Sequence, residues 1–267
     1  MITSTSNAKV KRLVNLKKKK KLRDEEGVFL VEGIRMFREV PLDKLKEVYV
    51  SESFYKKEKD TVKEVLKDSK VRVEELTDTV FAHASDTKTP QGILCVVEQM
   101  NHEINELTSA KCPLIMVLDH LQDPGNLGTI IRIADWFGIE HIFCSPDTAD
   151  LYNPKTVQAT MGAMARVCAH YLSLTDLLRT ANADIPVYGT FLDGNDMYGT
   201  ELSPNGLIVM GNEGKGISRD VASLINRKLY IPNYPPERNT SESLNVAVAT
   251  AIVCAEFRRR DTIGRQE

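Results

Sequence analysis

The chain has 267 residues, of which 42% are apolar, and its formal net charge is −2. This composition is typical of a globular protein with one large domain or two modest ones. No run of about 18 apolar residues occurs, and the N-terminus lacks the apolar centre of a secretory signal. We therefore expect a cytoplasmic protein with no membrane partner.

The cysteines and histidines are scattered along the chain. No CxxC pair occurs, and no histidine lies at ligand spacing from a cysteine. The thiols are therefore predicted to be buried and reduced, and no metal site is expected. The five cysteines are Cys95, Cys112, Cys144, Cys168 and Cys254.

Positive charge is concentrated at the N-terminus. The first 23 residues carry nine basic side chains and no acidic one. The pattern favours phosphate contact over its alternatives, a solvated helix face or a nuclear-type basic patch. The residues expected to bind RNA or another polyanion are Lys9, Lys11, Arg12, Lys17, Lys18, Lys19, Lys20, Lys21 and Arg23.

The first 105 residues are predicted to form a small α/β domain. Asn7 precedes a helix with apolar residues at helical spacing, and a strand follows over 28–31. Short apolar runs then alternate with charged helical segments as far as residue 97. Residues 98–112 lack a long apolar run and are the best linker candidate, so we divide the chain into domains 1–105 and 106–267.

The second domain is predicted to be α/β with a mainly parallel sheet and helices on both faces. Helices alternate with most of its apolar strands, which is the pattern of such sheets. Ligands bind beyond the carboxyl ends of the strands, where we place the loops 119–126, 211–216 and 232–243. Strands are expected at 114–118, 141–144, 166–171, 187–192, 207–210 and 228–231, and helices at 126–137, 155–161, 175–181, 218–225 and from about 243 to 260, the last capped by Ser241 or Ser243.

The glycine-rich turn 211–216 matches neither common phosphate-binding pattern. A P-loop requires Lys where Ile217 stands. The dinucleotide pattern requires a third glycine where Arg219 stands. No GxSxG or HExxH motif occurs elsewhere.

Three motifs in order resemble the SpoU/TrmH family of RNA ribose methyltransferases, within the SPOUT class. They are LDHLQDPGNLGTIIRIADWFGI, LIVMGNEGKGIS, and IP followed by SLNVAVATAI. The resemblance covers about residues 114 to 260. It implies a trefoil knot, which periodicity alone does not indicate.

The resemblance also implies a cofactor and a set of catalytic residues. S-adenosylmethionine would be held mainly by backbone groups of Thr190, Phe191, Leu192, Gly211, Ile231 and Leu244. The chemistry is assigned to Asn126, Arg132, Glu213, Ser243 and Asn245. Arg132 follows apolar neighbours on a helix, so we expect it beside the core with a partner. It would act either as the base of the family or, because a guanidinium resists deprotonation, as a phosphate-binding and charge-stabilising group.

The N-terminal part resembles the ribosomal-protein-like substrate-binding domain found in this family, through SNAKVKRLVNLKKKKKLRDEEGVFLVEG and SDTKTPQGILCVV. The family further implies a homodimer. We therefore expect a 2′-O-methyltransferase that acts on ribosomal RNA. The alternatives are a transfer-RNA methyltransferase and a non-catalytic RNA-binding or ribosome-assembly protein with the same fold.

Overall fold

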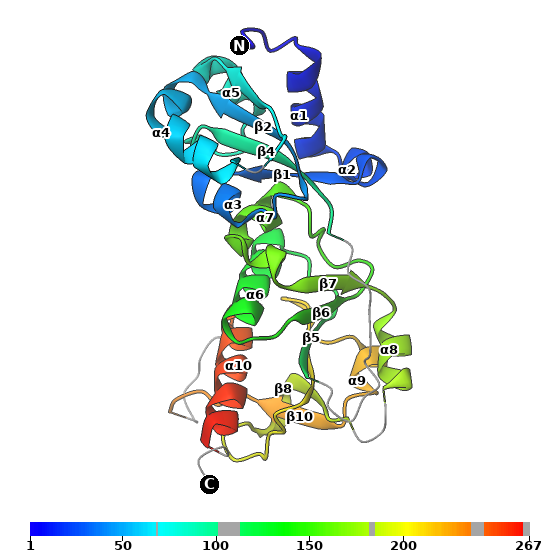
Figure 1. Ribbon diagram of the computed structural model, residues 1–267. Coiled ribbons are helices and arrows are strands. Elements are labelled where there is room, and N and C mark those ends of the chain that lie inside the picture. The colour runs from blue at the N-terminus through cyan, green and yellow to red at the C-terminus, as the bar shows by residue number, and fades with distance from the viewer. Residues whose placement is uncertain (68, 101–112, 182–184, 236–242, 264–267) are drawn as a thin grey trace. The chain divides into compact units, whose positions relative to one another are not determined.

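A computed structural model describes residues 1–67, 69–100, 113–181, 185–235 and 243–263. The chain forms two compact units (Figure 1). Unit 1 consists of Met1–Asn101 together with Asp150–Ala165, and unit 2 consists of His102–Ala149 and Arg166–Glu267. The predicted linker lies largely outside the described residues. Residues 150–165 therefore belong to unit 1, whereas the division by sequence placed this segment in the second domain.

Unit 1 is built on a four-stranded sheet in the order β1-β4-β2-β3. β4 is antiparallel to both β1 and β2, and β2 is parallel to β3. The sheet is therefore mixed, as in an α+β domain. Its elements are α1 (Ala8–Lys18), α2 (Lys20–Glu26), β1 (Val28–Glu32), α3 (Ile34–Glu39), β2 (Leu45–Ser51), α4 (Glu52–Val65), β3 (Val73–Leu76), α5 (Asp78–Ala84), β4 (Ile93–Glu98), α7 (Pro154–Thr160) and the short 3₁₀ helix Ala163–Ala165.

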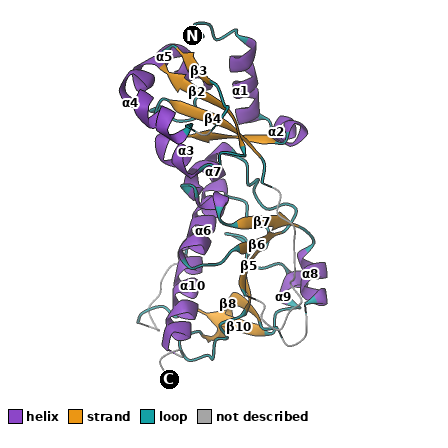
Figure 2. Cartoon of the chain, in the orientation of Figure 1, coloured by secondary structure: helices purple, strands orange, loops and turns teal. Residues whose placement is uncertain are grey.

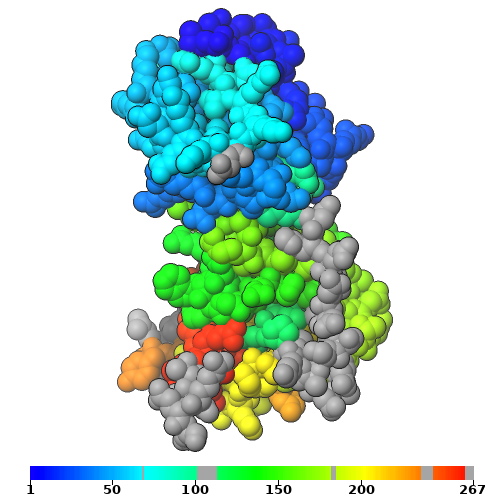
Figure 3. Space-filling view, in the orientation of Figure 1, coloured from blue at the N-terminus to red at the C-terminus, as the bar shows by residue number. Residues whose placement is uncertain are grey.

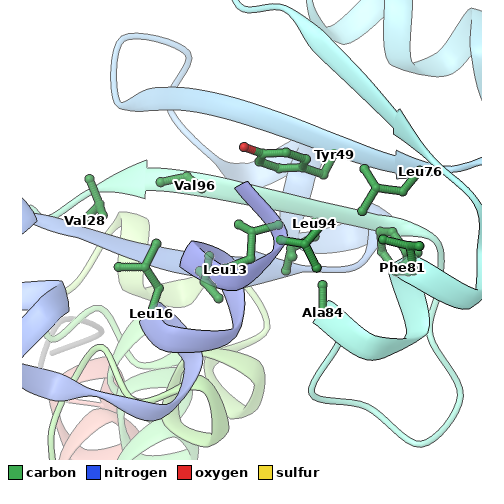
Figure 4. Packing of buried hydrophobic residues seen from close by; sticks show 12 residues of the cluster. Leu13, Leu16, Val28, Tyr49, Leu76, Phe81, Ala84, Leu94 and Val96 are labelled. Carbon is green, nitrogen blue, oxygen red and sulfur yellow. The ribbon is translucent and has the colours of Figure 1, made fainter. Parts of the chain in front are cut away.

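Helix α1 packs on this sheet through one apolar stripe. The sequence predicted a helix after Asn7, and the Asn7 side chain caps it by accepting a hydrogen bond from the Lys9 N–H. Leu13 and Leu16 are fully buried and lie against β1, β4 and α5 (Figure 4). α7 packs against β1 in the same unit, and just before α7 the ring of Tyr152 lies 4.8 Å from that of Phe29.

Unit 2 contains a six-stranded sheet in the order β10-β8-β9-β5-β6-β7. Every neighbouring pair in it is parallel, which confirms the predicted sheet type. Its elements are β5 (Leu114–Leu118), α6 (Pro124–Trp136), β6 (His141–Cys144), β7 (Cys168–Tyr171), α8 (Leu174–Thr180), β8 (Val187–Asp196), β9 (Gly206–Met210), α9 (Arg219–Ala222), β10 (Arg227–Tyr230) and α10 (Val246–Ile263).

Helices cover both faces of this sheet (Figure 2). α8 and α9 pack on one face over Ile115, Val117 and Val209. α6 and α10 lie on the other face, where the ring of Phe257 meets that of Tyr188 edge-on at 4.9 Å. The surfaces of α6 and α10 adjoin in the space-filling view (Figure 3), and the two helices pack against each other. Parallel strands covered on both faces are almost wholly apolar, as β5 and β9 are.

Two helix starts differ from the sequence predictions by more than one residue. α6 begins at Pro124, two residues early, because the Asp123 side chain caps it by accepting from the Asn126 N–H. α10 begins after Asn245, whose Oδ1 accepts from the N–H groups of Ala247 and Val248. Asn245 rather than Ser243 is therefore the cap, and Ser241 lies outside the described residues.

Cys95, Cys144 and Cys254 are buried as predicted, Cys168 is partly exposed, and Cys112 lies outside the described residues. Within the described ranges, no helix has the length and hydropathy needed to cross a membrane, and no three His, Cys, Asp or Glu side chains gather where they could hold a metal ion. The trefoil knot stays a prediction.

Candidate active site

The loops that carry the sequence motifs meet at one edge of the parallel sheet. β8, β9 and β5 are neighbours, so their carboxyl ends lie side by side. Leu118 faces Met210 in the ladder, and the Asp119 N–H donates to the Met210 carbonyl at 2.9 Å. The loop after β5 and the glycine-rich turn after β9 therefore start next to each other.

Three of the five predicted catalytic side chains form one hydrogen-bonded chain. The Asn126 Nδ2 donates to a Glu213 carboxylate oxygen at 3.1 Å, and the Asn245 Nδ2 donates to the Asn126 Oδ1 at 3.1 Å. These residues come from the start of α6, the turn after β9 and the start of α10. The fold thus brings together motifs that are separated by more than 80 residues, as the 87-residue interval from Asn126 to Glu213 shows.

Glu213 is held as a carboxylate by its surroundings. Desolvation by itself raises the pKa of Glu213, but hydrogen bonds from Asn126 and from the N–H groups of Asp123 and Gln122 outweigh it. The net result is a pKa below the usual value for glutamate. Glu213 is therefore an ionised acceptor that ties the turn after β9 to the loop before α6.

The glycine-rich turn is closed by its own backbone. Asn212 and Gly216 exchange two backbone hydrogen bonds of 2.9 and 3.0 Å. A Cβ atom on Gly211 would lie 2.3 Å from the carbonyl carbon of Gly216. Glycine is thus required at 211 by closure of the turn itself, whether or not a ligand approaches it closely.

Arg132 and Ser243 do not join this chain of hydrogen bonds. Arg132 is exposed, which corrects the expectation that it lies beside the core and needs a partner. Among the described residues its guanidinium has no hydrogen-bond or ion-pair partner. It shares the exposed face of α6 with Thr129 and Trp136, three residues before it and four after it. Ser243 is likewise exposed.

The segment predicted to hold the cofactor leaves the sheet ladder. Gly189 of β8 faces Lys228, whereas the next residue of β10, Leu229, faces Asn195. Residues 190–194 therefore have no partner on β10, and the pairing of β8 with β9 ends at Gly189. Such an excursion offers backbone groups to a ligand.

Exposed apolar side chains occur among the residues predicted to hold the cofactor. Leu192 is 73% exposed and Leu244 is 49% exposed, while Thr190, Phe191 and Ile231 are half-buried. Leu192, an exposed leucine on the unpaired backbone, offers the kind of surface that a nucleoside with a polar tail would use. The residues present thus fit the predicted cofactor.

The predicted RNA-binding residues of unit 1 differ in what they contact. Lys9 is paired with Glu74, Arg12 with Glu26 and Glu47, Lys20 with Asp24, and Lys21 with Glu25, while Lys17 donates to the Ser85 carbonyl. Lys11, Lys18 and Lys19 are exposed and have no ion-pair partner within the described ranges.

Arg23 corrects the prediction most clearly. Its side chain is 3% exposed and is bound to Asp150 at 2.5 Å and to the Leu16 carbonyl at 2.7 Å. It is a buried structural residue of unit 1 and offers no charge to the surface.

Several polar residues at the site were missed in the sequence. Asp119 is 1% exposed and its Oδ2 accepts from the Ser218 N–H at 2.7 Å. The Asn212 Oδ1 accepts from the N–H groups of Gly214 and Lys215, both at 3.0 Å. Two features of the sequence could have indicated polar residues here. One is an acidic residue, Asp119, directly after an apolar strand, and the other is the pair Asp123-Pro124, which is typical of a helix start.

The chain belongs to the SpoU rRNA Methylase family, whose model matches residues 113–255. A second model, the MRM3-like substrate binding domain, matches residues 7–95. The first match contains the sheet edge and the hydrogen-bonded residues Asn126, Glu213 and Asn245. The resemblance noted from the motifs is thus confirmed for both parts of the chain.

Relatives match along almost the whole chain. The 23S rRNA (guanosine(2553)-2′-O)-methyltransferase RlmP of Bacillus subtilis is 30% identical over 260 residues, which cover 96% of this chain and 98% of the relative. A solved structure from Porphyromonas gingivalis, described as an RNA methyltransferase of the TrmH family, is 36% identical with a TM-score of 0.79 and covers 96% of this chain and 100% of its own. An rRNA methyltransferase from Sinorhizobium meliloti, solved with AdoMet bound, is 29% identical with a TM-score of 0.83 and covers 97% of each chain.

Proposed function

We propose that the protein transfers the methyl group of S-adenosylmethionine to a ribose 2′-hydroxyl of ribosomal RNA, within the large-subunit RNA. The observation that carries the proposal is the hydrogen-bonded chain Glu213–Asn126–Asn245 at the sheet edge where the cofactor segment 190–194 leaves its ladder. RlmP, a relative that matches nearly the whole chain, is named for this reaction on 23S rRNA.

The cofactor supplies an electrophilic methyl group on a sulfonium, so the protein mainly has to position it and the ribose. Backbone groups of Thr190, Phe191 and Leu192 are free of β10 and β9 pairing and are proposed to bind it. Gly211 and Ile231 follow the neighbouring strands at the same edge. Leu244 offers apolar surface to the adenine.

Arg132 is proposed to bind the phosphate beside the target ribose and to stabilise the alkoxide character that develops on the 2′-oxygen as its proton leaves to water. An exposed arginine with no partner in the described part of the chain is available for this. The guanidinium stays protonated throughout, so this role needs no base with a shifted pKa. Asn126, Glu213 and Asn245 hold the loops that face the substrate, and Ser243 precedes the capped start of α10.

Unit 1 is proposed to bind the RNA through phosphate contacts. Exposed Lys11, Lys18 and Lys19 are the predicted cations that no described carboxylate neutralises. Phosphate contacts position RNA without reading its sequence, so choice of the nucleotide falls to the candidate active site at the sheet edge.

The protein is further proposed to be a cytoplasmic homodimer. Trp136 is 85% exposed on α6, one turn after Arg132, and Val248 is 49% exposed near the start of α10. A second copy that covered these side chains would bury apolar surface and exclude water near Arg132. Light scattering should give twice the chain mass.

Mapping of ribose methylation in total RNA from cells with and without the gene tests the function. One 2′-O-methylated nucleotide of the large-subunit RNA should disappear without the gene and return when the gene is restored. Loss of a transfer-RNA methylation instead, or no change in any RNA, would contradict the proposal.

A further inference from the structure

His120 has an unusual backbone for its place in the fold. Its φ is 55°, in the left-handed region, where a residue with a Cβ atom is strained. Met161 is the other non-glycine residue with positive φ in the described ranges, but it caps the end of α7, where this conformation is common. His120 ends no helix and lies in the loop between β5 and α6.

Two carboxylates flank the His120 ring. Its Nε2 lies 3.5 Å from an oxygen of the buried Asp119, and its Nδ1 is bound to Asp147. Asp119 belongs to the loop after β5 and Asp147 to the loop after β6. The ring therefore joins two neighbouring strand ends.

The backbone of His120 is also bonded on both sides. Its N–H donates to the Ser145 Oγ at 2.9 Å, and its carbonyl accepts from the Asn212 Nδ2 at 2.8 Å. The same Asn212 side chain orients the turn that carries Glu213 through its Oδ1. The left-handed conformation of His120 thus directs its carbonyl to the Asn212 side chain, which in turn holds the turn 212–216.

We propose that His120 is a positioning residue for the methyl transfer. Its ring, bound to Asp147 and flanked by Asp119, maintains the left-handed backbone, and its carbonyl aligns Asn212 so that Glu213 meets Asn126. The inference rests on the role proposed above for Glu213 and Asn126. His120 itself touches neither substrate nor cofactor in this scheme.

Paired substitutions separate the backbone from the ring. His120→Ala removes the ring and leaves a strained Cβ, whereas His120→Gly removes the ring and adopts positive φ without strain. We expect kcat to fall about fivefold or more in His120→Ala, the effect of about one hydrogen bond. His120→Gly should recover most of this loss, and KM for S-adenosylmethionine should change less than about twofold in both.

Hydrogen exchange supplies a readout that does not depend on activity. The amides of Gly214 and Lys215 should exchange faster in His120→Ala and close to the wild-type rate in His120→Gly. Met161→Ala and Met161→Gly are the matched controls, because they make the same change at positive φ without touching the turn. Wild-type kcat and exchange in His120→Ala, or equal losses in the Ala and Gly variants, would overturn the proposal.

A double-mutant cycle tests the route through Asn212. Asn212→Asp keeps the acceptor for Gly214 and Lys215 and removes the donor to the His120 carbonyl. In that background His120→Ala should lower kcat by less than about twofold, because the interaction is already lost. A full fivefold further loss would refute the route. A wild-type protein that methylates no RNA would contradict the proposed function, while the exchange rates would still decide the role of His120.

Discussion

Asn245 and Asn126 lie 119 residues apart in the chain and share a hydrogen bond of 3.1 Å between the Nδ2 of Asn245 and the Oδ1 of Asn126. The Nδ2 of Asn126 in turn donates to Glu213. Both the nitrogen and the oxygen of the Asn126 amide are therefore hydrogen-bonded, which fixes the orientation of the amide. The two bonds join the starts of α6 and α10 to the turn after β9.

Asn126→Asp should abolish this arrangement while keeping the shape of the side chain. The variant loses the donor to Glu213 and places two carboxylates in contact, so we expect kcat to fall at least about tenfold. Steady-state kinetics with the target RNA measure the effect. Asn153→Asp is the control: Asn153 caps α7 in unit 1, where aspartate caps equally well, and kcat should stay unchanged. Wild-type turnover in Asn126→Asp would contradict the assignment.

Arg132→Lys should lower kcat by about 100-fold, because an ammonium cannot reproduce the planar, bidentate contact of a guanidinium with phosphate and alkoxide. The melting temperature should not move, since Arg132 is exposed and has no partner in the described ranges. Cofactor affinity, measured by calorimetric titration, should also be preserved. Arg219→Lys, at another exposed arginine of unit 2, should leave kcat unchanged. Near-normal turnover of Arg132→Lys would rule out both the charge-stabilising role and a role as base.

Arg23→Met should destabilise unit 1 by about 3 kcal/mol, because it leaves the largely buried Asp150 carboxylate without its partner. The double variant Arg23→Met with Asp150→Leu should recover part of that loss, since no buried charge then remains. Urea unfolding measures both. Lys20→Met breaks the exposed pair with Asp24 and should cost less than about 1 kcal/mol. Equal costs for Arg23→Met and Lys20→Met would show that burial of the pair has no energetic weight.

Glu256 should make the stability of unit 2 depend on acid pH. Hydrogen bonds from Arg259 lower its pKa most; burial opposes this and Arg260 adds to it, with a result of about 2 against an ordinary 4.5. Because the folded-state pKa is depressed, the stabilisation is present above about pH 4.5 and is lost as pH falls towards 2.

Glu256→Gln should therefore cost about 2 kcal/mol at pH 7 and flatten the unfolding free energy between pH 4.5 and 2. Urea unfolding across this pH range measures both effects. Glu201→Gln, at an exposed glutamate, should leave the curve unaltered. An unchanged acid slope in Glu256→Gln would contradict the pKa assignment.

Local patterns sufficed where one stretch of chain determines its own structure. The continuous apolar runs 114–118 and 206–210 are strands β5 and β9, because a parallel strand covered on both faces buries every side chain. The spacing of Leu13 and Leu16 after Asn7 defined helix α1 and its buried face. The three motifs named the polar residues that meet at the sheet edge, although spacing could not show which of them touch.

Partners distant in the chain were decided only by the tertiary structure. Nothing near Arg23 in the sequence distinguishes it from the neighbouring lysines, and it is buried because Asp150, 127 residues away, comes to lie against it. Arg132 follows apolar neighbours yet faces outward. Successive side chains of a helix point in different directions around its axis, and position 132 lies on the side away from the core. The sequence by itself determined most of the strands and helices of unit 2 and three polar residues that meet at the site, Asn126, Glu213 and Asn245. Which side chains are buried, paired or left free was decided by long-range packing, because hydrogen bonds and ion pairs depend on distances in space that local periodicity does not encode.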